Sequence, residues 1–170
     1  MASFLSVLLA VSYCFPSGLH TVYMPTIEDT YIENRHRIQP NHTNNYETAH
    51  GGNVMKWMDQ TGALSAMRFA GETCVTASIN QMNFERPVPQ GETAVIQSYV
   101  FDHGKTSIKV RLRAFREDPC SGKRELTTES VFIFVAIGED GSPTSVPQLG
   151  VKSDRDKTLQ QDAREWANGN

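Results

Sequence analysis

The sequence predicts an α+β domain in which an antiparallel sheet surrounds one long buried helix. Residues 53–70 contain no Pro and carry apolar side chains around most of a helix circumference. Later segments change to the period of two that is typical of strands, and the turn at 102–105 joins two of them as a hairpin. A chain of 170 residues has the usual size of one domain.

The predicted helix follows Gly51 and Gly52, where unbonded backbone N–H groups collect, and it ends at Gly71. Its apolar positions cover too much of the circumference for a surface helix, so we expect it to be buried. These positions are Val54, Met55, Trp57, Met58, Leu64, Ala66, Met67 and Phe69.

The first predicted strand, residues 73–84, is rich in β-branched side chains. Val75, Ala77 and Ile79 share one face, and a change of phase before Met82 suggests a bulge.

Three further strands are predicted at 93–101, 106–115 and 125–137. In the second of these, apolar residues alternate with charged ones, so one face should meet the core and the other water or ion pairs. The core-facing positions are Ile108, Val110, Leu112 and Ala114. The last strand ends in the apolar run VFIFVAI, which indicates a central strand covered on both faces.

Composition argues against several classes of protein. With 16 Lys+Arg against 19 Asp+Glu the net charge is -3, so no basic surface is expected for a nucleic acid. Cys14, Cys74 and Cys120 are widely spaced and indicate reduced thiols in an intracellular protein. The sequence contains neither a Gly-rich phosphate loop nor an HExxH zinc motif.

The termini are expected to lie outside the main domain. Residues 4–15 are nearly all apolar, yet this stretch is too short to span a bilayer. We expect an extension at 1–23, the working domain at 24–149, and a polar tail at 150–170 with at most a short surface helix. A signal segment within 1–23 is the alternative to a cytoplasmic protein.

Asp59 is the most unusual residue of the predicted helix. It is a carboxylate within an apolar segment, where burial of an isolated charge is costly. A lone helical Asp is more often a surface residue, and here it could share a thin polar stripe with Lys56 and Gln60. Evidence from other residues has to decide between a surface role and a chemical one.

The loop that feeds the helix, NNYETAHGGN at residues 44–53, favours the chemical role. Small residues and a Gly-Gly pair at the start of a buried helix can direct backbone N–H groups at a developing oxyanion. The same glycines leave room for a large substrate to approach.

Several motifs agree with this interpretation in order and spacing. They are NxxxxxHGGxxxxxMD, VTASINQMNFERPV, GKTS and FIFVAIGEDGSPTSVPQL. Over residues 31–149 the chain resembles the hotdog-fold acyl-CoA thioesterases of the cytosolic acyl-CoA hydrolase branch. The resemblance implies a five- or six-stranded antiparallel sheet around one long helix, and dimers that often assemble three to a hexamer.

The resemblance also implies the catalytic residues. Asp59 would orient and deprotonate the attacking water, or attack the acyl carbon itself. The Gly52 N–H would bind the thioester oxygen, while Asn44 of the partner subunit would hold the water or the carbonyl. His50 is left out because the family pattern permits an apolar residue at its position. No metal and no other cofactor is implied.

Coenzyme A carries phosphates, so its site needs cations on an exposed rim. Lys105, followed by Thr106 and Ser107, matches the basic-Thr-Ser turn that meets the nucleotide in the family. Arg86 and Arg124 are weaker candidates, since each could equally be a solvated surface charge. The resemblance also implies that three residues contact the pantetheine arm of coenzyme A: Thr76, Ser78 and Asn83.

The expected activity is hydrolysis of acyl-CoA to a free fatty acid and coenzyme A. One alternative is a hotdog dehydratase of hydroxyacyl thioesters, which would use a His as its base. The other is a non-catalytic acyl-CoA-binding module.

Overall fold

The computed structural model describes residues 24–169, so the extension assigned to residues 1–23, like Asn170, lies outside the described residues. The elements in chain order are α1 (Ile27–Thr30), β1 (Ile32–Arg37), the 3-10 turn η1 (Pro40–His42), α2 (Gly51–Ala70), β2 (Thr73–Ile79), β3 (Thr93–His103), β4 (Ser107–Glu117), β5 (Arg124–Ile137) and α3 (Asp154–Gly169). None of the helices in this part of the chain is long and apolar enough to cross a membrane.

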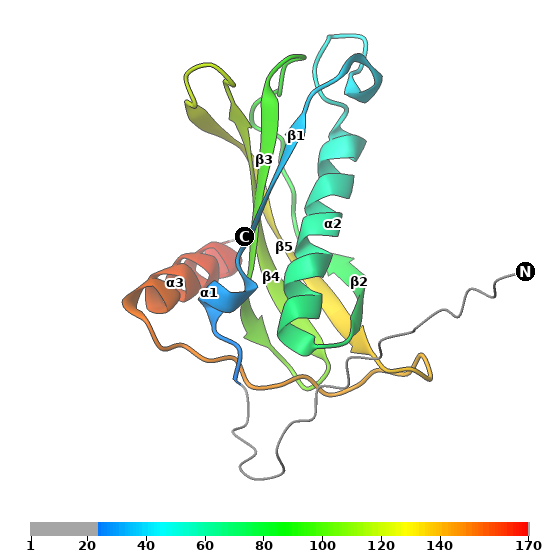
Figure 1. The fold of residues 1–170 in the computed structure, drawn as a ribbon, viewed down its shortest axis with the longest axis vertical. Coiled ribbons are helices and arrows are strands. Elements are labelled where there is room, and N and C mark those ends of the chain that lie inside the picture. Colours follow the sequence, from blue (N-terminus) through cyan, green and yellow to red (C-terminus); the bar gives the residue numbers. More distant parts are fainter. Residues whose placement is uncertain (1–23, 170) are drawn as a thin grey trace, which may run out of the picture.

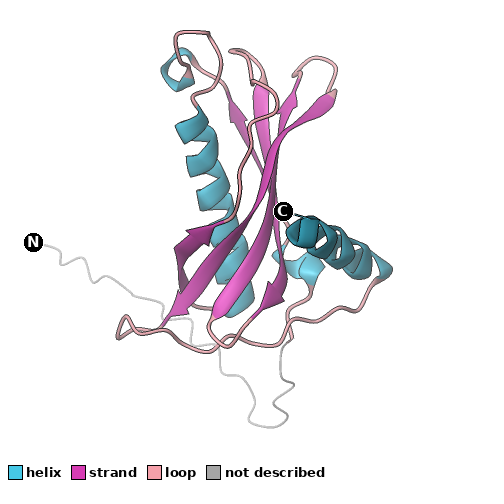
Figure 2. Cartoon of the chain, turned by 180° about the vertical axis from the view of Figure 1, so that it is seen from behind, coloured by secondary structure: helices cyan, strands magenta, loops and turns pink. Residues whose placement is uncertain are grey.

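The five strands form one antiparallel sheet in the order β1-β3-β4-β5-β2. Helix α2 lies lengthwise along one face of this sheet, and α3 lies against the other face (Figure 1). The view from behind shows the same two layers of helix on either side of the strands (Figure 2). The predicted α+β arrangement, a sheet around one long helix, is therefore confirmed.

Helix α2 begins and ends where the glycines predict. His50 is its N-cap, and Gly71 closes it in the left-handed conformation at φ 72° with its N–H donated to the carbonyl of Met67. Gly62 lets the helix approach the sheet closely, because a Cβ there would lie 3.1 Å from the Phe134 ring and 3.2 Å from Leu112. The helix starts two residues before the predicted range.

The expectation that α2 is buried on all sides is wrong in part. Val54, Met58 and Phe69 are in the core, but Met55 and Leu64 are 37% and 48% exposed. These two residues are nine positions apart, so they lie on opposite sides of α2, at the two margins of its buried face.

The central strands follow the prediction, with β3 extended to His103 and the hairpin turn reduced to residues 104–106. All four predicted core positions of β4 are buried. Arg111, on the opposite face of β4, is also buried: it pairs with Glu129 across 2.6 Å, and its guanidinium carbon lies 4.3 Å from the centroid of the Trp166 ring. This is the expected ion-paired face, covered by α3.

Strand β2 differs from its prediction in length and phase. It ends at Ile79, and the bulge lies between Thr76 and Ser78, not before Met82. Cys74 is the buried residue of the strand, while the side chains of Val75 and Ile79 are 44% and 40% exposed. The reason is topological, since within residues 24–169 β2 pairs only with β5 and is an edge strand of the sheet.

The C-terminal segment was expected to form at most a short surface helix, and this is wrong. Helix α3 has 16 residues and packs on the sheet through Leu159, Ala163 and Trp166, which recur at helical spacing. Asp156 anchors its start by accepting hydrogen bonds from the N–H groups of Lys152 and Ser153. The described residues of the predicted tail are thus packed against the domain.

Candidate active site

Asp59 lies midway along α2 with its side chain half-buried. Its Oδ1 accepts a hydrogen bond of 2.5 Å from the hydroxyl of Thr76, which comes from β2. Among the described residues no Lys or Arg forms an ion pair with this carboxylate, and Lys56 is not its partner. The carboxylate is therefore held by a neutral donor, an arrangement that leaves its charge and one oxygen free for chemistry.

The start of α2 carries the second element of the site. The imidazole Nδ1 of His50 accepts a hydrogen bond of 3.1 Å from the Gly52 N–H. Gly51 lies against the Phe84 ring, which would be 3.5 Å from a Cβ at that position. The Gly52 N–H, expected to meet the thioester oxygen, is thus present and exposed, but it is capped by His50.

Asn44 lies in the loop before α2 and holds that loop together. Its Oδ1 accepts hydrogen bonds from the N–H of Tyr46 at 2.9 Å and from the hydroxyl of Thr48 at 3.2 Å. Glu47, between them, has a positive φ of 56°. Within residues 24–169 the Nδ2 of Asn44 donates to no partner, so this side chain can offer two N–H groups to a ligand.

The structure brings some of the predicted residues together and separates others. Asn44 and Arg86 both line one pocket of about 350 Å³, with Gly51 at its rim. Asp59 follows Gly52 by seven positions in α2, which puts it on the same face of the helix about 10 Å further along. Neither a hydrogen bond nor this pocket connects Asn44 with Asp59 inside the described chain.

Lys105 lies in the β3–β4 turn, at the end of the molecule where α2 ends. The end of α2 and this turn are neighbours, because the centroids of the Phe69 and His103 rings are 5.6 Å apart. The Lys105 ammonium is exposed and has no ion pair or hydrogen bond with any described residue. Thr106 and Ser107, which follow it, are half-buried. This turn can offer a free cation to an anionic ligand.

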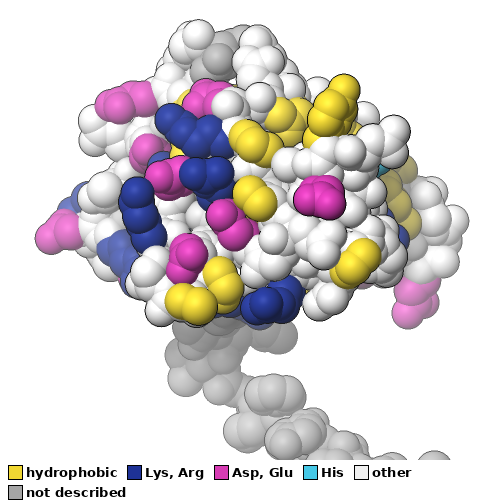
Figure 3. Space-filling view, turned by 90° about the horizontal axis from the view of Figure 1, so that it is seen from above, with side chains coloured by type: hydrophobic (Ala, Val, Ile, Leu, Met, Phe, Trp, Pro, Cys, Tyr) yellow, Lys and Arg dark blue, Asp and Glu magenta, His cyan; other side chains and the backbone are white. Residues whose placement is uncertain are grey.

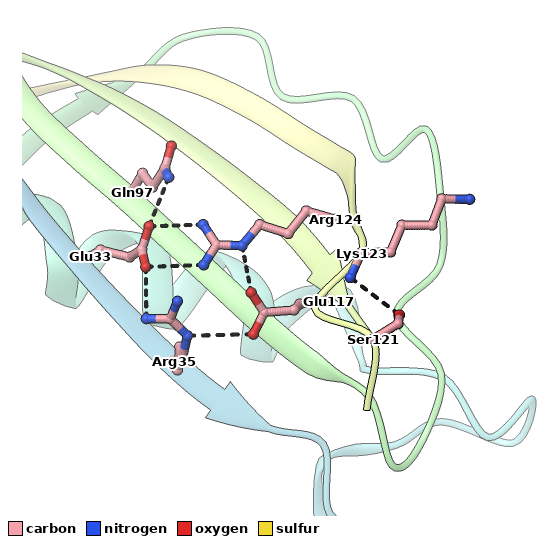
Figure 4. Close-up of polar contacts among 7 residues, drawn as sticks. All are labelled: Glu33, Arg35, Gln97, Glu117, Ser121, Lys123 and Arg124. Atoms are coloured by element: carbon pink, nitrogen blue, oxygen red, sulfur yellow. Dashed lines mark hydrogen bonds and ion pairs between the residues drawn. The ribbon is translucent and has the colours of Figure 1, made fainter. Parts of the chain in front are cut away.

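Arg124 occupies the opposite end of the sheet, at the start of β5. Strand β4 separates it from the turn of Lys105 by 11 residues, roughly 35 Å of extended chain. Its guanidinium pairs with Glu33 at 3.0 Å and with Glu117 at 2.5 Å (Figure 4). The bond from Arg124 holds the pKa of Glu117 below its usual value. The weaker expectation that Arg124 binds coenzyme A is not supported, because its charge is already neutralised.

The other expected contacts are scattered over β2 and the segment after it. Thr76 was expected to contact the pantetheine arm, but in this structure its hydroxyl donates a hydrogen bond to the Asp59 carboxylate. Ser78 and Asn83 are exposed. Arg86 donates to the carbonyl of Leu126 at 2.9 Å and keeps its remaining N–H groups beside the pocket.

Charge is distributed unevenly at the end of the molecule where α2 begins. Seen from above, most acidic and basic side chains lie side by side over one half of this face, while hydrophobic side chains are scattered over both halves (Figure 3). Tyr46 and Phe84 are the large hydrophobic residues exposed in the loops flanking the start of α2. Sequence reasoning missed a further pocket residue, Thr127, because a buried Thr in a strand carries no distinctive signal.

Comparison with known proteins shows the family to which this chain belongs. The family model of the Thioesterase superfamily matches residues 46–122. A Bacillus subtilis protein named uncharacterized acyl-CoA thioester hydrolase YkhA is 33% identical over 132 residues, covering 78% of this chain and 77% of its own length. The chain belongs to the thioesterase superfamily, among the acyl-CoA thioester hydrolases.

Other members of the superfamily agree in sequence and fold. The Salmonella typhimurium acyl-CoA thioester hydrolase YciA is 33% identical over 114 residues, which cover 65% of this chain and 86% of that protein. The crystal structure of an acyl-CoA hydrolase from Bacillus cereus superposes with a TM-score of 0.78 at 27% identity, over 86% of this chain and 89% of that one. The hotdog fold implied by the sequence motifs is thereby confirmed for this thioesterase-superfamily chain.

Proposed function

We propose that this chain hydrolyses the thioester of acyl-CoA, releasing a carboxylic acid and coenzyme A. The observation that carries the proposal is the position of the Asp59 carboxylate. Asp59 lies on α2 and accepts a hydrogen bond from Thr76 of β2. The N-terminus of α2, with its backbone N–H groups, lies on the same face of the helix. A carboxylate can take the proton of an attacking water, and the N–H of Gly52 can stabilise the oxyanion that forms.

Related structures support these assignments. An acyl-CoA hydrolase from Staphylococcus aureus, solved with butyryl coenzyme A and coenzyme A, superposes with a TM-score of 0.78 at 27% identity over 86% of this chain and 89% of that one. Further structures of that enzyme carry an Asn, an Asp or a Thr replaced by Ala, spaced by fifteen and seventeen positions along its chain. Asn44, Asp59 and Thr76 have the same two spacings in this chain.

The site is proposed to form between two subunits, because within the described residues no hydrogen bond or shared pocket connects Asn44 with Asp59. Among the described residues no strand pairs with the outer edge of β2, and the exposed side chains of Val75 and Ile79 lie on this strand. A second chain could extend the sheet at this edge. One structural neighbour, with a TM-score of 0.76 at 31% identity, is a hexameric acyl-CoA thioesterase, which supports a trimer of dimers as the larger assembly.

The chemistry is proposed to need no metal and no cofactor, since polarisation of the carbonyl by backbone N–H groups replaces a Lewis acid. No group of three His, Cys, Asp or Glu side chains in residues 24–169 is arranged to hold a metal ion.

The direct test measures release of free thiol from a panel of acyl-CoAs by the full chain, with and without a chelator. Asp59→Asn keeps the shape of the carboxylate but removes the base, so kcat should fall by roughly 10²-fold or more with little change in KM. Asp102→Asn, at a carboxylate paired with Lys109 near the β3–β4 turn, is the control and should retain activity. Near-normal turnover by a folded Asp59→Asn protein contradicts the mechanism. Hydration of an enoyl-CoA without thiol release would favour a dehydratase.

A further inference from the structure

Helix α2 is hydrogen-bonded to the two outermost strands of the described sheet through residues only two positions apart. Asp59 accepts a hydrogen bond from Thr76 of β2, and the Thr61 hydroxyl accepts one of 3.2 Å from Nδ2 of Asn34 on β1. Two positions along a helix turn a side chain by about 200°, so these bonds leave α2 on nearly opposite sides. Together they resist rotation of the helix about its own axis.

A third contact comes from β3, an inner strand of the sheet. The hydroxyl of Ser98 donates a hydrogen bond of 3.0 Å to the backbone carbonyl of Thr61. Because a serine hydroxyl carries one proton, the 2.6 Å bond between the hydroxyls of Ser98 and Ser65 must then be donated by Ser65. Ser98 therefore links the side chain of one helix residue to the backbone of another.

These polar groups lie in an otherwise apolar interface. Thr61, Ser65 and Ser98 are fully buried, and so are Ile96 and Val100, which flank Ser98 on the same face of β3. Apolar packing has little directionality, whereas a hydrogen bond requires a narrow range of distances and angles. A buried polar network whose members are paired favours one arrangement of the core. The contact of Ser98 thus fixes where α2 lies along β3.

Resting on the proposed thioesterase function, we propose that Ser98 is a positioning residue for the Asp59 carboxylate. Its bond to the Thr61 carbonyl holds the helical turn that carries Asp59 where Thr76 can reach the carboxylate. A small displacement of a reacting group slows the chemical step, and support from surrounding residues prevents it. Ser98 is closed off from solvent, so it would act on the reaction only through the helix.

The test is a double-mutant cycle between Ser98 and Thr76. Ser98→Ala should lower kcat by about fivefold or more with little change in KM, because the carboxylate is misplaced while substrate binding is intact. In a Thr76→Val background the same substitution should lower kcat by less than about twofold, since the contact that Ser98 helps to align is already absent. Equal falls in the two backgrounds overturn the inference, because a general loss of structure acts independently of Thr76.

Thr30 of α1 supplies a matched control for the loss of a buried hydroxyl. It is fully buried, and its hydroxyl donates to the carbonyl of Ile27 at 2.8 Å and accepts the N–H of Val100 at 3.0 Å. This bond reaches β3 two residues from Ser98 but does not involve α2. Thr30→Val should lower the free energy of unfolding about as much as Ser98→Ala and leave kcat unchanged. An equal fall in kcat in Thr30→Val contradicts the inference.

A conservative variant keeps the test available if Ser98→Ala does not fold. Ser98→Cys retains a weak donor, so its kcat should lie between those of the wild-type chain and Ser98→Ala. Its fall in kcat should also disappear in the Thr76→Val background, and persistence of the fall there overturns the inference while the thioesterase function stands. No thiol release by the wild-type chain from any acyl-CoA overturns the function itself.

Discussion

The hydroxyl of Thr76 donates a hydrogen bond to Oδ1 of Asp59 across 2.5 Å, and this bond joins strand β2 to the middle of helix α2. It fixes one oxygen of the carboxylate and leaves the other available to a water molecule. Because Thr76 borders the bulge of β2, the position of the carboxylate depends on the local irregularity of an edge strand.

Thr76→Val should therefore lower kcat, by roughly tenfold, because the carboxylate loses the donor that orients it. The effect on KM should be small. Thr76→Ser keeps the hydroxyl and should retain most of the activity, whereas a loss of folding in the Val variant would show in circular dichroism. Full activity of a folded Thr76→Val protein would mean that the bond does not position Asp59.

His50→Phe tests the cap on Gly52. Loss of the imidazole should lower the free energy of unfolding by about 1 kcal/mol, which is the usual contribution of an N-cap residue. Denaturant unfolding measures this change. It should also free the Gly52 N–H, so kcat/KM should rise or stay the same. A fall in kcat as large as that of Asp59→Asn would instead assign proton transfer to His50 and strengthen the dehydratase alternative.

Lys105→Ala should raise KM for acyl-CoA with a modest effect on kcat, since a contact with phosphate far from the reacting carbon stabilises ground and transition states alike. Acyl-pantetheine substrates, which lack the nucleotide, should not be affected. Lys109→Ala, at a nearby lysine already paired with Asp102, is the control and should change neither parameter. Equal losses on both substrates would mean that Lys105 is structural.

Mixed oligomers test whether a site is shared. Asn44→Ala and Asp59→Ala should each be nearly inactive as homodimers, because every site lacks one group. In a mixed dimer one site carries both defects and the other carries none. Random co-assembly makes half the dimers mixed, so the pool should recover roughly a quarter of wild-type activity. Co-expression supplies the mixture, and size exclusion confirms assembly of both variants. Verified mixed dimers without activity would contradict the shared site.

Gly62→Ala tests the close contact of α2 with the sheet. The added Cβ would lie 3.1 Å from the Phe134 ring, and overpacking of this kind typically costs 1–3 kcal/mol. Ala is favoured over Gly in a helix by about 1 kcal/mol, so the net loss of unfolding free energy should be about 1 kcal/mol. A more stable variant would show that the ring can move aside.

The sequence predicted α2 and the three central strands because each has a clear period and clear ends. It missed β1, whose residues IENRHR have no apolar alternation, since β1 is an edge strand linked to the sheet by ion pairs such as that of Glu33 with Arg124 of β5 (Figure 4). It also underestimated α3, because only four apolar residues of that helix pack in the cluster beside the sheet.

The motifs assigned Asp59 to catalysis and Thr76 to the pantetheine arm, and both roles stay predictions. No spacing could indicate that these two residues bond each other, or that Arg124 is neutralised by Glu33 and Glu117. Such contacts join residues far apart in the chain and depend on register. The cytoplasmic location and the role of residues 1–23 stay predictions.

Strand β2 has one further consequence, for the chain before it assembles. No strand in the described part of the chain pairs with the N–H and C=O groups of its outer edge, and its seven residues, TCVTASI, include no charge and no Pro. Proteins usually protect such edges with Lys, Pro or a covering element, because an open edge can pair with any extended segment. Correct pairing of two chains and aggregation would then compete for the same surface. The refolding yield should therefore depend on how quickly β2 pairs with β2 of a second chain.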